Sequence, residues 1–545
     1  MKSKKTIFAL TLATLGITSC VVPEGPQPNK PDNEPIEIRI GANVSLEAKR
    51  SNYEYNVLSG ATTQLAPVSL NEKGFYEPQL TTFETKDNKT YTFKVREGMK
   101  WHDGTKVTAE DILYTLKYED EFGNGHNFKD VTDDNGKITK KLYESFAVSD
   151  DKTIIVLTLT TANVRYLSNL VTLRIMPKHI FEGKESEVTD EQSLIGCGPF
   201  KFKSFDKNAN TLIFEKFEEC PIKVKPDKLI YTLYKNDTSL YQAMKNNTID
   251  TVYKYSTGVS KEGLAALKND HNIVIKSIPG KNVPAALTFN NSFELFKDLN
   301  VKNAISYALE YDHYKTLFSV ESAKTPNRSF IPTSQEFAIE TTALETNLSK
   351  ATELLNKSGY TKKDGDKYFK KDNKNLEFTL TTKIDANNLH PRYGDAVKTS
   401  LEKIGIKVNL ESLDTTKYNE KASNKFSHNN VTHEAAIFGY TPFGLNSGAG
   451  FGAIYMDANH PVQGGGQVKD QKFSEIITKL TTSKTLEEYS ENAKLIQKYY
   501  ETNIPAISLF SANTSYVFSA KYDNFAIDST FGIINYKTWE NISKK

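Results

Sequence analysis

The sequence predicts an α/β fold built from more than one domain, and two observations support this prediction. Between residues 349 and 410, helix-like and strand-like apolar patterns alternate, and the two helical stretches end at Gly359 and Gly405. Strands that alternate with helices in this way are typical of a parallel sheet with right-handed crossover connections. The chain has 545 residues, which is enough for two or three domains with sizeable cores.

A strand, a turn and a helix are predicted between residues 91 and 118. Apolar and polar residues alternate over residues 91–96, which indicates a strand with one buried face. Residues 102–105 have the composition of a tight turn, in which Gly104 supplies the unusual backbone angle. Thr108 stands three residues before Asp111, the spacing of an N-terminal capping pattern. The helix that follows has one apolar face, made by Ala109, Ile112, Leu113 and Leu116.

Residues 1–19 predict a lipoprotein signal peptide. Three lysines precede a short apolar run, which ends in the sequence Ile-Thr-Ser-Cys of a bacterial lipobox. We expect Cys20 to become the lipidated first residue, since two or more acyl chains give stable anchoring; an ordinary signal peptide with a chance cysteine is the alternative. Residues 20–35 hold five prolines and predict an extended tether. No other stretch approaches the roughly 18 apolar residues of a membrane-spanning helix.

The charge balance argues against a nucleic-acid partner. The chain has 69 basic and 67 acidic side chains, and three of the lysines fall in the predicted signal peptide. Proteins that bind nucleic acids carry a marked basic excess, which is missing here. The 28 tyrosines and 30 phenylalanines are compatible with a stacking ligand cavity and equally with ordinary cores.

Cys197 and Cys220 are the two cysteines that follow Cys20, and the sequence predicts that they form a disulfide. A hairpin with its turn near residue 208 pairs positions whose numbers sum to 417, which sets the two cysteines directly opposite each other. Such a pair can have the spacing that a disulfide needs, and an exported protein meets an oxidising environment. The alternative is a pair of buried free thiols.

Several motifs together resemble the signature of one protein family. An aromatic-x-Phe-x-Leu-Arg strand, an aromatic-His-Asp-Gly turn and a Thr-Ala-Glu-Asp helix start correspond to residues 91–96, 101–104 and 108–111. Further matches lie at residues 174–180, 196–200, 247–250 and 287–290, with Cys197 where the family usually has Thr or Ser. Over residues 36–530 the chain is therefore similar to family 5 of the extracellular solute-binding proteins, which serve ABC importers of peptides and nickel.

The resemblance implies an α/β, periplasmic-binding-protein-like fold of class II, cluster C type. Such a fold has two lobes, an additional domain in the first lobe, and two crossovers that act as a hinge. We expect the first-lobe core in residues 36–60, 187–282 and 505–545, the additional domain in residues 61–186, and the second lobe in residues 283–504. After a second crossing near residues 502–505, strands at 507–510 and 515–518 are expected to rejoin the first lobe.

The resemblance also implies a function. We expect a monomeric binding protein, anchored to the outer side of a bacterial membrane, that captures a small solute between its lobes and delivers it to ABC permease subunits. Short peptides are the favoured solute. A nickel- or metallophore-binding protein of the same family is one alternative, and a surface adhesin or sensor that kept the fold is the other.

Six candidate ligand-binding residues lie where strands or glycine-flanked loops should meet the cleft. In peptide-binding members of the family, an Asp that follows a Gly-Trp pair binds the α-ammonium group of the ligand. Here residues 439–440 are Gly-Tyr, and residues 441–446 hold no carboxylate. Because a buried unpaired charge costs several kcal/mol, this clamp does not transfer, and Asn446 and Asp457 are the possible substitutes. The candidates are Asn43, Asn290, Tyr440, Thr441, Phe443 and Asn446.

We predict neither enzymatic activity nor a resident metal or cofactor. The sequence has no Gly-x-Ser-x-Gly, Walker or His-Glu-x-x-His motif. His428 and His433 are five residues apart, which is not a recognised metal-ligand spacing. His102, Asp103 and His179 are interpreted as turn and helix-start residues.

Overall fold

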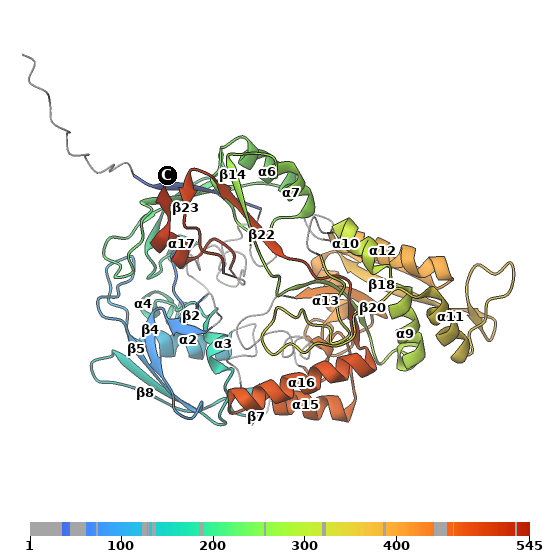
Figure 1. Cartoon of the computed structure of the whole chain (residues 1–545). Coiled ribbons are helices and arrows are strands. Elements are labelled where there is room, and N and C mark those ends of the chain that lie inside the picture. Colours follow the sequence, from blue (N-terminus) through green and yellow to red (C-terminus); the bar gives the residue numbers. More distant parts are fainter. Residues whose placement is uncertain are drawn as a thin grey trace, which may run out of the picture. The chain divides into compact units, whose positions relative to one another are not determined.

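Three main sheets organise residues 36–545 (Figure 1). In the computed structural model, residues 36–545 form one unit. The structure describes residues 35–43, 62–71, 75–122, 128, 130–132, 138–184, 190–254, 258–318, 323–384, 389–440, 455–460, 463–528 and 531–545.

The first lobe is built on a seven-stranded mixed sheet with the order β10-β11-β12-β1-β13-β22-β14. At its centre, β1 runs parallel to both β12 and β13. Ile38 and Ile40 of β1 are fully buried, as the alternation in the sequence requires. The strands are β1 (Glu37–Ala42), β10 (Phe200–Asp206), β11 (Thr211–Lys216), β12 (Lys228–Leu233), β13 (Thr251–Val252), β14 (Ile273–Ile278) and β22 (Thr514–Ser519).

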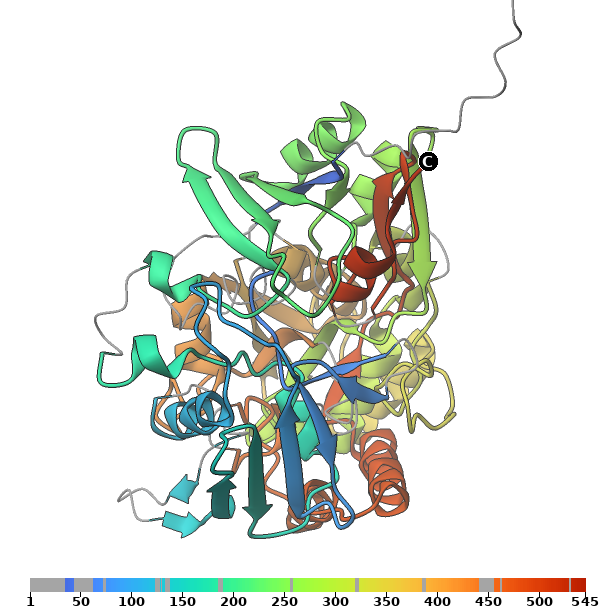
Figure 2. The same ribbon diagram turned by 90° about the vertical axis from the view of Figure 1, so that its left-hand side faces the viewer.

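The additional domain is built on a four-stranded antiparallel sheet with the order β4-β5-β9-β8, seen at the bottom of Figure 2. Its strands are β4 (Thr81–Glu84), β5 (Thr90–Val95), β8 (Tyr143–Val148) and β9 (Ile154–Leu159), and helix α2 (Ala109–Glu121) packs on it. Tyr91, Phe93 and Val95 are buried and alternate with more exposed residues, as predicted. The predicted helix start is confirmed as well, because the Thr108 N–H donates to Asp111 Oδ2 at 2.8 Å.

The second lobe is built on a five-stranded sheet with the order β19-β18-β20-β15-β21. Both faces of this sheet are buried. Leu287 of β15 joins a core with α9, α11 and α12, whereas its neighbour Ala286 joins a core with α15 and α16. The strands are β15 (Val283–Phe289), β18 (Glu377–Lys383), β19 (Lys407–Leu413), β20 (Ala435–Tyr440) and β21 (Ala506–Ser508). The helices are α9 (Leu299–Ala308), α11 (Leu348–Lys357), α12 (Leu389–Ile404), α15 (Gln471–Thr481) and α16 (Leu486–Asn503).

Two adjacent crossovers connect the lobes. The chain passes from β14 to β15 and returns from β21 to β22, and these strands pair with each other at Ile278–Thr514 and at Ala286–Ser508. A Cβ atom on Gly280 would lie 1.9 Å from the Ala512 carbonyl oxygen, so the two crossing segments touch. The return crossing lies later than predicted. Residues 506–508 still pair with β15, and the predicted assignment of residues 507–510 to the first lobe was therefore wrong, whereas β22 does belong to it.

Shorter elements complete the structure. They are the helices α3 (Tyr166–Leu170), α4 (Lys178–Phe181), α5 (Asp190–Ser193), α6 (Asp237–Lys245), α7 (Lys261–Leu267), α8 (Glu294–Lys297), α10 (Tyr311–Phe318), α13 (Thr415–Ala422) and α17 (Tyr536–Asn541). The small two-stranded sheets are β2 (Val68–Leu70) with β3 (Tyr76–Pro78), β6 (Val131–Thr132) with β7 (Ile138–Lys140), β16 (Lys370–Lys371) with β17 (Lys374–Asn375), and β23 (Tyr522–Asp523) with β24 (Ser543–Lys544).

Candidate functional site

The carboxyl ends of the parallel strands in both lobes lie at the crossovers. In the first lobe, β13 is antiparallel to β22 and therefore points toward Thr514, where β22 begins. In the second lobe, Tyr440 at the end of β20 lies opposite Val283, where β15 begins. The carboxyl edge of an open α/β sheet is where ligands usually bind, and here two such edges are joined by the same pair of connections.

The carboxyl edge of the first lobe carries a nearly buried ion pair. Lys254 Nζ lies 2.6 Å from Asp237 Oδ1, and the two side chains are only 12% and 13% exposed. Asp237 begins α6, where its Oδ2 accepts a hydrogen bond of 3.2 Å from the Tyr241 hydroxyl. The edge thus offers one positive and one negative group in a partly desolvated setting, where charge interactions are stronger than in water.

Asn43 lies at this edge, as predicted, because it directly follows β1. Its Nδ2 donates to Asp237 Oδ1 at 3.3 Å. Asp237 and Lys254 were missed by the sequence analysis. Lys254 comes two residues after β13, so the rule that selected Asn43, a polar residue just beyond a parallel strand, would also have selected Lys254.

Tyr440 lies at the carboxyl edge of the second lobe, but its ring belongs to the core. It is 9% exposed and stacks on Phe330 with 5.8 Å between the ring centroids. Burial raises the pKa of the Tyr440 hydroxyl well above its ordinary value. The other candidates of this loop, Thr441, Phe443 and Asn446, lie outside the described residues.

Asn290 lies at the opposite end of the five-stranded sheet, and its placement in the cleft was wrong. It follows the carboxyl end of β15, which is antiparallel to β20, so it neighbours the start of β20 and not its end. Its Nδ2 donates to the His433 carbonyl oxygen at 2.8 Å, and its Oδ1 accepts from the Ser292 N–H at 3.1 Å. The buried side chain therefore holds a turn.

Cys197 and Cys220 are buried free thiols, so the structure does not contain the predicted disulfide. The hairpin has a bulge between Phe202 and Ser204, and the predicted register holds only on the turn side of this bulge. The strands also stop at Phe200 and Lys216, short of both cysteines. The Cys220 Sγ lies 3.8 Å from the Cys197 carbonyl oxygen, and burial raises the pKa of its thiol to about 11.

The histidines of the sequence motifs hold loops together. His102 Nδ1 accepts from the Gly196 N–H at 3.2 Å, and its Nε2 lies 2.9 Å from the Gly198 carbonyl oxygen. The His102 imidazole therefore connects the motif at residues 101–104 to the motif at residues 196–200. His179 Nε2 lies 2.6 Å from Asp103 Oδ2 on the partly exposed surface nearby. Within the described ranges, no three His, Cys, Asp or Glu side chains gather as metal ligands would.

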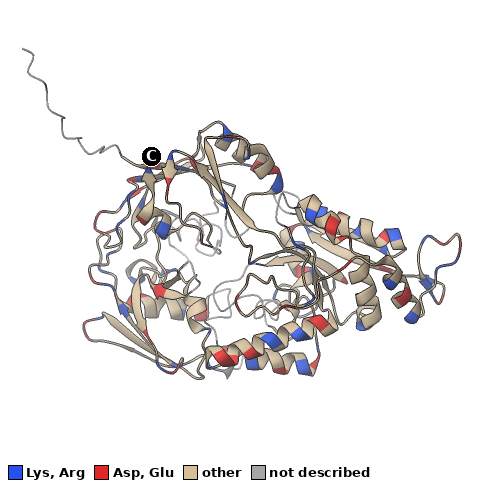
Figure 3. Ribbon diagram, in the orientation of Figure 1, with Lys and Arg blue, Asp and Glu red and all other residues tan. Residues whose placement is uncertain are grey.

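Charged side chains of both signs are spread over the described ribbon, including the outer helices α15 and α16 (Figure 3). This mixture of both signs agrees with the near-neutral charge of the sequence. Among the helices that the structure describes, none has the length and the apolar character needed to cross a bilayer.

Comparison with known proteins identifies the family. Residues 76–456 match the model of the bacterial extracellular solute-binding proteins, family 5. The dipeptide-binding protein DppE of Bacillus subtilis is 25% identical over 357 residues, which cover 61% of this chain and 60% of DppE. The oligopeptide-binding protein AppA of the same organism is 25% identical over 342 residues, or 59% of this chain and 58% of AppA. The matched segments thus span less than two thirds of these relatives.

Solved structures share the fold over nearly the whole chain. NikZ from Campylobacter jejuni, in complex with Ni(L-His), superposes with a TM-score of 0.73 at 21% identity, covering 93% of this chain and 99% of NikZ. AppA from B. subtilis, in complex with a nonapeptide, also gives a TM-score of 0.73, at 18% identity, covering 93% of this chain and 100% of AppA. These matches confirm the two-lobed binding-protein fold, and the chain belongs to the bacterial extracellular solute-binding proteins of family 5.

Proposed function

We propose that this protein is the substrate-binding component of an ABC importer, and that it captures an extracytoplasmic solute between its two lobes. The observation that carries the proposal is the paired crossover. Both lobes turn the carboxyl ends of their parallel strands toward the same two connections, so bending there would open and close the space between the two edges.

We propose short peptides as the solute. The relatives DppE and AppA are named for binding dipeptides and oligopeptides. The edge of the first lobe supports this choice, because Asp237 and Lys254 place a carboxylate beside an ammonium group. A zwitterionic peptide has one partner for each of its termini at such an edge, and desolvated charges need partners.

We further propose that the mature protein starts at a lipidated Cys20 and hands its solute to membrane permease subunits. The lipobox-like sequence before Cys20 and the proline-rich residues 20–35 support an anchor with an extended tether. Labelling cells with a radioactive fatty acid should mark the protein, and the Cys20→Ala variant should lose the label and leave the membrane fraction. A Cys20→Ala variant that keeps both would exclude the anchor.

The decisive experiment is native mass spectrometry of residues 21–545, purified without refolding and then denatured to release bound molecules. A set of short peptides in the released fraction would support the proposal. Release of nickel with a small organic chelator would indicate a metallophore, and not peptides, as the solute. An empty protein that shows no thermal shift with peptides or metals would favour an adhesin or sensor role.

The residues of the site are tested by substitution. Asp237→Asn and Lys254→Met should each weaken peptide binding at least tenfold if the pair holds the peptide termini, and Tyr440→Ala and Asn446→Ala test the candidates that the sequence predicts in the second lobe. Lys494→Met on α16 is the control, because this lysine is exposed and pairs only with Glu491 of the same helix. Unchanged affinity in all four variants would remove these two edges from the site.

A further inference from the structure

A pocket among the described residues lies between the additional domain and the C-terminal segment. Its volume is about 120 Å³. One wall comes from β2, β3 and the residues just after α3, and the other comes from residues 526–528 and 531–540, including α17. Figure 1 shows α17, β2 and α3 on the same side of the molecule. No residue of the five-stranded sheet lines it, so this pocket does not depend on closure of the second lobe.

The two walls are tied together by polar contacts. The Tyr536 hydroxyl donates to the Gln64 carbonyl oxygen at 2.5 Å. Lys537 Nζ lies 3.2 Å from Glu77 Oε1, which also accepts a hydrogen bond from the Ser69 hydroxyl at 3.4 Å. The pocket therefore lies between two walls that are held together.

Two charged groups on the walls lack an ion-pair partner among the described residues. Arg96 follows β5 and donates one hydrogen bond, from Nη1 to the Gln79 carbonyl oxygen at 3.1 Å, which leaves most of its donors unused. Glu540 follows α17's first turn and is half-buried. Burial raises the pKa of the Glu540 carboxyl, against the opposite influence of Lys537 and Arg96. A partly desolvated carboxylate and a guanidinium with free donors both favour a ligand of opposite charge.

The charged side chains of Glu77, Arg174, Asp528 and Lys537 also line the pocket. The apolar part of the lining includes Leu70, Val171, Ile222, Ile527, Phe531 and Ile534. Such a lining suits an aliphatic or aromatic group, whose burial is favourable by about 25 cal/mol per Å².

We propose that this pocket is a second solute site, which takes a small zwitterion with an apolar side chain, such as a free α-amino acid. The ligand carboxylate pairs with Arg96, the ammonium group pairs with Glu540, and the side chain lies against the apolar lining. This inference goes beyond the proposed function, because it concerns a site made by the first lobe and the additional domain alone.

Three matched probes test the charge requirement by calorimetry on residues 21–545. L-Phenylalanine has the ring and both charges, phenethylamine has the ring and the ammonium group, and 3-phenylpropanoate has the ring and the carboxylate. We expect L-phenylalanine to bind at least tenfold more tightly than either analogue. Equal affinity for all three, or no binding of L-phenylalanine at millimolar concentration, would overturn the proposal.

Two variants then locate the site. Glu540→Gln should weaken binding of L-phenylalanine at least tenfold and leave 3-phenylpropanoate unchanged, whereas Arg96→Gln should weaken both. The control is Glu491→Gln on α16, which is 71% exposed and should change neither affinity. Full affinity for L-phenylalanine in Glu540→Gln would overturn the proposal, even if the proposed peptide capture between the lobes is correct.

A measurement on the unaltered protein covers the case in which a variant fails to fold. Crystals grown with 4-bromo-L-phenylalanine should place the anomalous bromine signal beside Phe531 and Ile534. A bromine peak found only elsewhere would exclude this pocket. If the protein binds L-phenylalanine but no peptide, the proposed capture of peptides between the lobes is contradicted, whereas the second site is not.

Discussion

Asp250 is a buried carboxylate whose partner reaches it from the neighbouring strand. It is 1% exposed and accepts hydrogen bonds from the Arg39 N–H and Nε at 2.9 Å each and from Nη2 at 2.6 Å. Removing one partner of a buried pair costs about 3–5 kcal/mol. We expect Asp250→Ala to cost about 3 kcal/mol, the low end, because the Arg39 side chain is 35% exposed and regains some water.

Urea unfolding measures this cost, and an exposed pair supplies the comparison. Glu491 and Lys494 lie on the same helix and are 71% and 42% exposed, so Glu491→Ala should cost much less stability than Asp250→Ala. If the two substitutions cost the same, the buried pair makes no special contribution.

His102 should make the protein sensitive to mild acid. Burial lowers the pKa of its imidazole from 6.5 to about 4, and protonation of Nδ1 would also break the hydrogen bond from the Gly196 N–H. His102 therefore takes up a proton near pH 6.5 in the unfolded chain, but only near pH 4 in the folded protein. Stability falls as the pH drops through this interval, by up to about 3 kcal/mol.

The His102→Gln variant tests this dependence. It should be less stable at neutral pH, yet it should lose about 2 kcal/mol less than the parent between roughly pH 7 and pH 4.5. Burial lowers the pKa of His433 to about 4 as well, so His433→Gln should show the same trend. Parallel pH profiles for parent and variants would show that neither histidine is held neutral.

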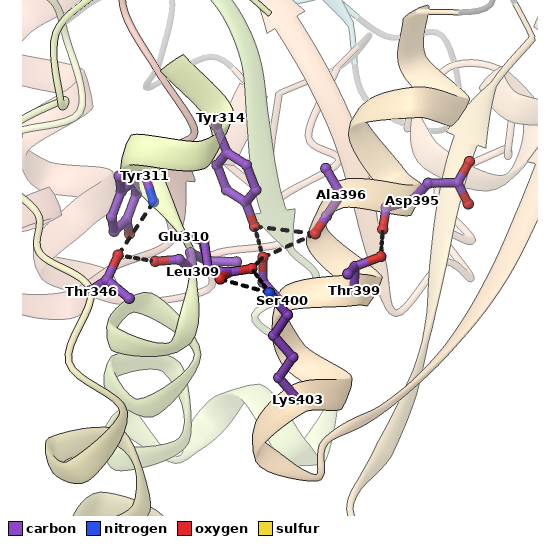
Figure 4. Close-up of polar contacts among 10 residues, drawn as sticks. All are labelled: Leu309, Glu310, Tyr311, Tyr314, Thr346, Asp395, Ala396, Thr399, Ser400 and Lys403. Carbon is purple, nitrogen blue, oxygen red and sulfur yellow. Dashed lines mark hydrogen bonds and ion pairs between the residues drawn. The ribbon is translucent and has the colours of Figure 1, made fainter. Parts of the chain in front are cut away.

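A polar network joins helices α10 and α12 (Figure 4). The Tyr314 hydroxyl lies 2.6 Å from Ser400 Oγ, which is 3.3 Å from Glu310 Oε2, and Lys403 pairs with the same carboxylate at 2.7 Å. Tyr314 is fully buried. A buried hydroxyl with a satisfied hydrogen bond contributes about 1 kcal/mol, and an orphaned partner costs more.

We therefore expect Tyr314→Phe to lower the free energy of unfolding by about 1–2 kcal/mol. Combination with Ser400→Ala should cost less than the sum of the two single substitutions, since both remove the same bond. The matched control is Tyr307→Phe, whose ring packs under Lys350 while its hydroxyl makes no hydrogen bond among the described residues. Additive costs would mean that the network does not couple the two helices.

Local patterns were enough to predict most elements, and long-range pairing was not. The strand at Thr90–Val95 and the helix at Ala109–Glu121 follow from alternation, a turn and a cap, all of which lie within the segment itself. The bulge in the β10–β11 hairpin leaves no mark in the sequence, and it shifted the register by one residue. The sheet to which residues 506–508 belong was also predicted wrongly, because a short apolar strand fits either sheet.

The candidate site was predictable only in part. Asn43 and Tyr440 do lie at the carboxyl edges of the two sheets, because Asn43 follows β1 and Tyr440 ends β20. Asn290 also follows a strand, but the direction of β15 in its sheet depends on the crossover, which a pattern of residues does not reveal.

At the scale of the whole molecule, contacts join the second lobe to both parts of the first. Near the crossovers, Arg392 of α12 lies 3.1 Å from Glu262 of α7, and Lys261 donates to the Thr316 carbonyl oxygen. Away from them, the additional domain contacts the turn between α15 and α16, where the Val164 N–H donates to the Ser483 carbonyl oxygen at 3.1 Å. These contacts stabilise the arrangement of lobes described here, and each is small enough to break during a hinge motion.

Asn88 offers a way to weaken that arrangement without touching the ligand edges. Its Nδ2 donates to the Lys484 carbonyl oxygen at 2.8 Å, and its φ of 52° suits glycine. Asn88→Gly therefore removes the bond between domains and keeps the local backbone. An exposed hydrogen bond of about 0.5–1 kcal/mol corresponds to a two- to fivefold shift in the equilibrium between closed and open lobes.

Single-molecule energy transfer between dyes on the two lobes, without solute, should show this shift as a larger open fraction in Asn88→Gly. The matched control is Asn524→Gly, which also has a positive φ, of 65°, and loses a hydrogen bond to Ser543 Oγ within the first lobe. Apparent solute affinity should fall by the same factor as the closed fraction, because only the closed form holds the ligand from both sides. Equal open fractions in the two variants would show that the contact at Lys484 does not hold the lobes together, and the contacts beside the crossovers would then carry the closed state.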